Sequence, residues 1–125
     1  MTGNRIKITA GDVVVSAELG DSDTAQLLWD ALPIHASGNV WGDEIYFGIG
    51  VNAELDDGAE ETVELGTVGY WPPGDALCLF FGPTPMSVGD EIRPASAVNI
   101  LGMIEGDSTV LKAVSGGTVV SVERE

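Results

Sequence analysis

Short runs of β-branched and aromatic residues, separated every few positions by glycine, proline or aspartate, restrict this chain to a fold made of short strands. Seventeen of its 125 residues are glycine, which favours turns and weakens helix interiors. Arg5 to Thr9 alternates apolar and polar residues, and Gly11-Asp12 leads into Val13 to Leu19, so we expect an opening β-hairpin. The pattern predicts a mainly β protein.

Further strands are expected in seven later runs, each bounded by turn residues. They are Asn39 to Trp41, Glu44 to Ile49, Thr62 to Leu65, Thr67 to Trp71, Ala76 to Phe81, Val98 to Ile104 and Thr118 to Glu123. Open edges of a sheet invite pairing with other chains, so a set of about eight strands favours closure. We therefore predict a closed or nearly closed eight-stranded β-barrel.

Two short helices are expected to cover the open ends of the barrel. The first begins with Asp23 as N-cap and Gln26 completing a capping box, and Pro33 ends it. Its apolar face comprises Leu27, Leu28, Ala31 and Leu32. The second is predicted over Asp107 to Val114, capped by Asp107 or Ser108, before Gly116-Gly117.

Size and charge narrow the class of protein. A chain of 125 residues with 44% hydrophobic residues and positive mean hydropathy can bury a core, so we expect residues 1–125 to form one domain. The formal net charge of −15 argues against nucleic acid and anionic membranes as partners. Three explanations of the acidic excess stay open: adaptation to a saline host, ordinary acidic composition, or a specific cationic partner.

Residue types that usually hold metals or perform nucleophilic catalysis are scarce. Cys78 lies in an apolar run and is interpreted as a small buried hydrophobe, and His35 follows Pro33 without a second histidine or cysteine nearby. The sequence contains no phosphate loop, EF-hand or zincin motif. We expect no metal, no cofactor and no catalytic residue. The beginning of the chain shows no signal peptide pattern, which favours a cytoplasmic location.

The order of short motifs resembles the cyclophilins. Thr24 to Leu32 is similar to the T-A-x-N-F-x-x-L helix after the second cyclophilin strand, Pro73 to Leu77 to the P-G-x-L strand entry, and Ile100 to Gly106 to the F-G-x-V-x-x-G segment. The segments L-W-D-A-L-P-I, W-G-D-E-I-Y-F, G-Y-W-P-P-G and F-F-G-P-T-P-M-S resemble those of small prokaryotic cyclophilin-like proteins. The resemblance implies their barrel, and for that family no established activity.

True prolyl isomerases differ from this chain in the segments that carry catalysis. They have an arginine in an F-H-R-x-I segment of the third strand, whereas Glu44 to Ile49 contains none, and their G-S-Q-F-F-I segment and the following loop are missing. The isomerase residues therefore cannot be transferred. The resemblance leaves the enzyme question open, with the balance against an enzyme.

Aromatic and proline residues gather around the predicted middle strands. Successive strand residues face opposite sides, so Tyr46 and Phe47 cannot both be core, and neither can Tyr70 and Trp71. In the cyclophilin arrangement the substrate lies on the outer face, and outward rings there would form an apolar groove. The groove residues that we predict are Trp41, Tyr46, Phe47, Tyr70, Trp71, Phe81, Thr84, Pro85 and Met86.

The sequence thus predicts a cyclophilin-like, non-catalytic module that binds a small or extended apolar ligand, either a small molecule or a peptide. Two alternatives stay open. One is a diverged peptidyl-prolyl cis-trans isomerase, and the other is a structural or assembly protein that uses the aromatic face as a homodimer interface. A competing interpretation of the aromatic residues is that they simply cap the barrel.

Overall fold

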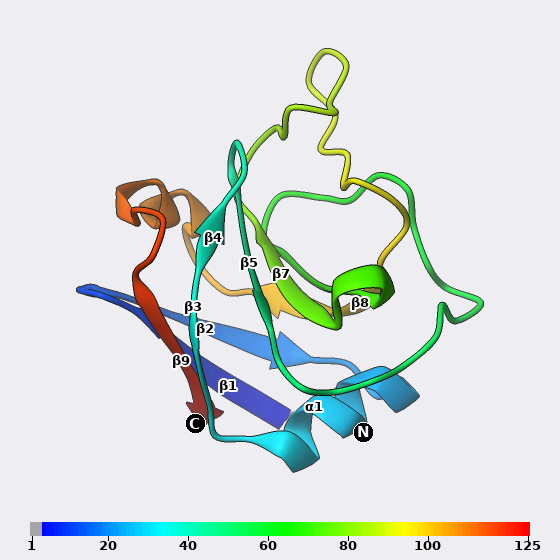
Figure 1. Cartoon of the computed structure of the whole chain (residues 1–125), viewed down its shortest axis with the longest axis vertical. Helices are drawn as coiled ribbons and strands as arrows, with labels where there is room; N and C mark the ends of the chain where they lie inside the picture. The colour runs from blue at the N-terminus through cyan, green and yellow to red at the C-terminus, as the bar shows by residue number, and fades with distance from the viewer. Residues whose placement is uncertain (1–3) are drawn as a thin grey trace.

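A computed structural model describes residues 4–125 of the chain (Figure 1). The elements are β1 (Asn4–Ala10), β2 (Val13–Leu19), α1 (Asp23–Ala31), β3 (Ile34–Ser37), β4 (Asn39–Val40), β5 (Glu44–Gly48), β6 (Thr67–Trp71), η1 (Pro72–Gly74), β7 (Ala76–Phe80), β8 (Asn99–Ile104), η2 (Ser108–Ala113) and β9 (Val119–Arg124). All neighbouring strands pair antiparallel, in the order β3-β9-β1-β2-β8-β6-β7-β5-β4. The mainly β prediction is confirmed.

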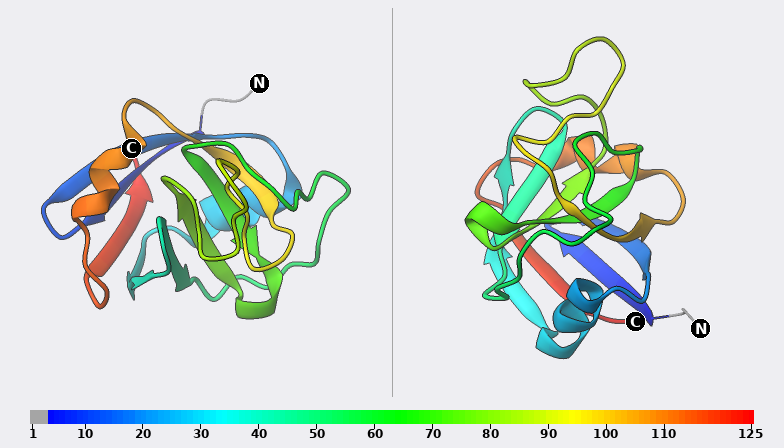
Figure 2. Two further views of the ribbon diagram at one scale, coloured as in Figure 1. Left: turned by 90° about the horizontal axis from the view of Figure 1, so that it is seen from above. Right: turned by 90° about the vertical axis from the view of Figure 1, so that its right-hand side faces the viewer.

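The two edges of this sheet are consecutive in the chain, which brings the barrel close to closure. Gly38 joins β3 to β4, donates its N–H to the Thr118 carbonyl at 2.8 Å and accepts from the Gly117 N–H at 2.8 Å. A Cβ at Gly38 would lie 2.9 Å from Val120 Cγ2, so glycine lets the chain cross from one edge to the other. The strands curl around one interior in Figure 2.

The expected strand count needs two corrections. The described residues form nine strands rather than eight, because Ile34–Ser37 pairs with β9 as a strand that the sequence analysis did not predict. The expected strand at Thr62 to Leu65 is wrong. There only Val63 makes an isolated bridge, donating its N–H to the Ile92 carbonyl at 2.9 Å, and its neighbours are exposed. Without a continuous partner strand, a β-branched run stays a loop.

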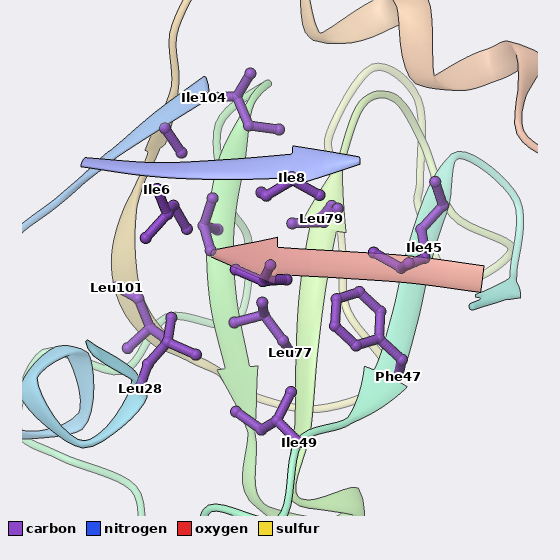
Figure 3. Packing of buried hydrophobic residues seen from close by; sticks show 14 of the residues in the cluster. Ile6, Ile8, Leu28, Ile45, Phe47, Ile49, Leu77, Leu79, Leu101 and Ile104 are labelled. Carbon is purple, nitrogen blue, oxygen red and sulfur yellow. The ribbon is translucent and has the colours of Figure 1, made fainter. Parts of the chain in front are cut away.

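The interior is filled by alternate residues of the strands, as the period of two requires. Figure 3 shows Ile6 and Ile8 of β1 together with Phe47 of β5 and with Leu77 and Leu79 of β7, all essentially inaccessible to solvent. Burying such side chains is the main favourable contribution to folding of a domain this size.

Both helices form where they were predicted, but the capping of the first helix differs from the prediction. Ser22, not Asp23, is the N-cap of α1 and accepts from the Ala25 N–H at 3.2 Å. The predicted capping box does not form, because the Gln26 amide donates to Asp30 instead. Leu28 is buried in the core. Leu27 is 44% exposed and so does not belong to the core-facing side.

The second expected helix is a 3₁₀ helix, η2, and Asp107 caps it by accepting from the Thr109 N–H at 3.0 Å. Its Leu111 packs into the core. In Figure 1, α1 lies below the strands and η2 lies at the upper left. No helix among residues 4–125 is long and apolar enough to cross a membrane.

A second apolar cluster lies on the outer face of the sheet. It comprises Ala76, Cys78, Phe80, Ile92 and Val98. The β7 members alternate with the interior residues Leu77 and Leu79, and the long connection between β7 and β8 supplies Ile92 and Val98. This connection reaches the top of Figure 1 before it returns to the sheet. It covers part of the outer face and leaves a hollow beside it.

Candidate functional site

A pocket of about 140 Å³ opens on the outer face of β5, β6 and β7, and we call it the outer pocket. Glu44 and Tyr46 come from β5, Trp71 from the end of β6 and Cys78 from β7. The rest of the lining consists of Trp41 before β5 and of Pro94, Ala95 and Val98 from the connection to β8. Three aromatic rings therefore surround a space with one carboxyl group at its wall.

The strand register explains why these side chains meet. Tyr46 pairs with Cys78, which in turn pairs with Gly69 of β6, so the three lie in one row across the sheet. A Cβ on Gly69 would lie 3.1 Å from Val98 Cγ2, so the missing side chain lets Val98 pack directly on β6. Cys78 thus lies between Tyr46 on one side and Gly69, covered by Val98, on the other.

One ring of each neighbouring aromatic pair points outward, as strand alternation requires. Tyr46 and Trp71 line the outer pocket, whereas Phe47 and Tyr70 point into the barrel and are fully buried. Figure 3 shows Phe47 among the interior side chains. Phe81 is also an interior residue. Of the nine predicted groove residues, the structure brings Trp41, Tyr46 and Trp71 together in the pocket.

Tyr70 has a different role from the predicted one. Its hydroxyl donates to the Val51 carbonyl at 2.7 Å and accepts from the Ala53 N–H at 3.1 Å. Residues 51 and 53 belong to the long β5–β6 connection, so Tyr70 fixes the start of that loop from inside the barrel.

Thr84, Pro85 and Met86 do not line the outer pocket. The Thr84 hydroxyl donates to the Arg93 carbonyl, and the Ser87 hydroxyl oxygen accepts from the Arg93 N–H at 3.1 Å. These bonds close the loop between Thr84 and Arg93, and the next residue, Pro94, lines the pocket. Met86 lines a neighbouring hollow, which shares Pro94 with the pocket, and Pro85 is exposed beside the turn at Gly42.

The wall made by residues 94–98 is held in place by Trp71. Its indole Nε1–H donates to the Ser96 hydroxyl at 2.7 Å. This bond holds the Trp71 ring and the loop of residues 94–98 in a fixed position relative to each other. A pocket wall that is positioned before binding costs a ligand less conformational entropy.

Glu44 is the polar residue of the pocket that the sequence analysis missed. Glu44 is 5% exposed. Among the buried side-chain nitrogen and oxygen atoms of the described residues, its Oε1 is the one without a hydrogen-bond partner. Burial raises the pKa of Glu44 to about 7, and the nearby Cys78 thiol lowers that pKa only in part. The signal was the i, i+2 spacing of Glu44 and Tyr46, which puts both on one face.

Cys78 is buried and His35 is exposed, so the two residues have different surroundings. Burial, followed by the nearby charge of Glu44, raises the pKa of the Cys78 thiol well above its ordinary value, so the thiol stays protonated. His35 is exposed, and its Nδ1 lies 2.9 Å from the Ser121 hydroxyl. Within residues 4–125 no three histidine, cysteine or acidic side chains lie close enough together to hold a metal ion.

Comparison with known proteins agrees with the observed barrel. The family model described as cyclophilin-like matches residues 4–123. The solution structure of a hypothetical protein from Archaeoglobus fulgidus is similar to this chain with a TM-score of 0.83 and 44% sequence identity, covering 98% of this chain and 95% of that one. No curated protein matches the sequence.

Proposed function

The chain belongs to the cyclophilin-like family, and from that premise we propose that it is a binding protein that holds a small, largely apolar ligand in the outer pocket. The observation that carries the proposal is the concave space bounded by Trp41, Tyr46 and Trp71 on the outer face of the barrel. Sites for small ligands are typically apolar hollows with few polar groups.

The dimensions of the pocket indicate the size of the ligand. A cavity of roughly 150 Å³ in a protein core holds one benzene molecule, and the outer pocket encloses about 140 Å³. The pocket therefore fits one ring or one branched four-carbon group. This favours a small molecule over an extended peptide, which would need a row of such hollows.

The positions of the charged groups argue against the isomerase alternative. Rotation about an X-Pro bond is accelerated only by contacts that strengthen in the twisted state, which requires a donor aimed at the proline nitrogen. The charged side chain in the outer pocket is the acid Glu44. The Arg93 guanidinium is paired with Glu91 at 2.7 Å and lines the neighbouring hollow.

Titration with two neutral probes of matching size, toluene and 3,3-dimethyl-1-butanol, tests the proposal. We expect chemical-shift changes in the backbone amides of Tyr46, Cys78 and Val98, because these residues line the pocket. In Ala95→Trp the new ring fills the pocket from its exposed rim, so the changes should disappear. The control variant Ser115→Trp adds the same ring at an exposed position outside the pocket lining and should bind as the wild type does.

Two results would contradict this function. One is the absence of amide shifts with either probe at millimolar concentration. The other is a set of shifts that Ala95→Trp leaves unchanged, since binding would then occur elsewhere. Self-association that depends on Trp41 and Trp71, with no effect of either probe, would favour the assembly alternative.

A further inference from the structure

The unpaired carboxyl of Glu44 indicates what kind of group the ligand carries. Glu44 lines the outer pocket, and its buried Oε1 has no hydrogen-bond partner in the described part of the chain. A buried carboxylate without a partner is costly, and such atoms are rare in folded proteins. The Cys78 thiol beside it is a weak donor. A ligand that offers positive charge or an N–H group would compensate the buried oxygen.

Among residues 4–125, no basic side chain forms an ion pair with Glu44. Within residues 4–125 each basic side chain is engaged elsewhere. Arg5 pairs with Glu105 and Glu125, Lys7 with Glu123, Arg93 with Glu91, Lys112 with Asp43, and Arg124 lies over the Trp29 ring. Lys112 approaches Asp43, the neighbour of Glu44 in the chain, with a distance of 3.9 Å between Nζ and Oδ2. A positive group that pairs with the Glu44 carboxylate would therefore come from a ligand.

The rings that surround Glu44 suit a cation with an apolar surface. Trp41, Tyr46 and Trp71 line the same pocket, and the faces of such rings attract positive charge. Sets of aromatic rings recognise alkylated ammonium groups because the alkyl carbons pack on the rings while the charge is spread over them. The net charge of −15 also raises the concentration of cations near the surface.

We propose that the outer pocket binds a small alkylated ammonium compound, with its alkyl groups against Trp41, Tyr46 and Trp71 and its positive charge facing Glu44. This inference rests on the proposed function and specifies the ligand class of the same site. A trimethylammonium group has the branched shape and the size that about 140 Å³ admits. A bare metal ion does not suit the pocket, because rings and one carboxylate supply too few ligands.

Choline and its uncharged analogue 3,3-dimethyl-1-butanol form the matched pair of probes. They have the same shape, and carbon replaces nitrogen in the alcohol. We expect choline to bind the wild type about tenfold more tightly, the difference that a cation facing aromatic rings and a carboxylate produces. Affinities are measured from the amide shifts of Tyr46, Cys78 and Val98 at low salt.

Two variants separate the local charge of Glu44 from the general acidity of the surface. Glu44→Gln keeps the side-chain size and removes the charge, so choline should lose about tenfold in affinity and the alcohol should not change. Glu18→Gln removes one charge from an exposed position of β2 and should leave both affinities as in the wild type.

A second measurement uses the unmodified protein. Tyr46 of β5 and Cys78 of β7 are the other titratable groups that line the pocket. Lowering the pH from 8 to 5 should protonate Glu44 and weaken choline binding, while binding of the alcohol stays constant. The Cys78 thiol is protonated throughout that range, so it does not contribute.

The possible outcomes distinguish this inference from the proposed function. Equal binding of both probes, tighter binding of the alcohol, or a choline affinity that Glu44→Gln leaves unchanged would overturn the ammonium assignment and leave the pocket as an apolar site. No binding of either probe would overturn both. A preference for choline over the alcohol that disappears in Glu44→Gln and at pH 5 supports both the proposed function and the ammonium assignment.

Discussion

Replacing Glu44 by glutamine should change the pH dependence of folding stability. The folded state holds this carboxyl at a pKa of about 7, compared with 4.5 for a freely solvated glutamate, because burial disfavours the charged form. A carboxyl whose pKa is raised on folding contributes stability that is fully present below pH 4.5. That stability is lost as the pH rises to about 7 and stays lost above it.

The size of the effect follows from the shift. At about 1.4 kcal/mol per pKa unit, the change from 4.5 to about 7 corresponds to roughly 3 kcal/mol. Because the outer pocket opens to solvent, water reduces the penalty, and we expect ~1–3 kcal/mol in the experiment. Glu44→Gln has no charge to bury, so its stability should lack this decrease between pH 4.5 and 8.

Urea unfolding at pH values from 4.5 to 8 and constant salt measures the difference. The quantity of interest is the wild-type free energy of unfolding minus that of Glu44→Gln, followed with pH, because the other carboxylates cancel in it. Glu18→Gln, an exposed acid on β2, is the control and should run parallel to the wild type. Parallel curves for the wild type and Glu44→Gln would refute the reasoning, since the buried carboxyl would then ionise without cost.

The remaining predictions concern salt, catalysis and packing. If the acidic surface is adapted to a saline host, screening of 15 excess negative charges should raise the melting temperature between low salt and molar KCl, and a flat or falling curve would exclude that explanation. In an NMR exchange assay we expect no acceleration of isomerisation of an Ala-Pro peptide, and a catalysed rate that vanishes in Arg93→Ala would show that this arginine acts as the donor. Leu28→Ala should reduce the free energy of unfolding by ~2–5 kcal/mol and the exposed neighbour Leu27→Ala by far less, so similar losses in denaturant melts would contradict the placement of α1.

Strand alternation made part of the site predictable from the sequence. It requires that one ring of Tyr46 and Phe47, and one of Tyr70 and Trp71, point outward, and the structure places Tyr46 and Trp71 in the pocket. The barrel followed from the strand pattern and the family resemblance. The extra strand β3 was missed because Ile34–Ser37 directly follows Pro33 and contains only four residues.

The parts of the site that were not predicted depend on contacts between distant segments. Glu44 is buried because residues 94–98 return to the outer face some fifty positions later in the chain, which no local pattern contains. Cys78 was expected to be buried and it is, yet it lies on the outer face beneath that connection. Phe81 was assigned to the groove, but it belongs to the interior because Phe80 takes the outward position.

Intermolecular nuclear Overhauser effects with bound choline would show whether the outer pocket is the ligand site. We expect contacts from the choline methyl protons to ring protons of Trp41, Tyr46 and Trp71, which line the pocket together. These contacts should disappear in Ala95→Trp. Methyl contacts to any other part of the surface, or contacts that persist in Ala95→Trp, would mean that choline binds outside the outer pocket.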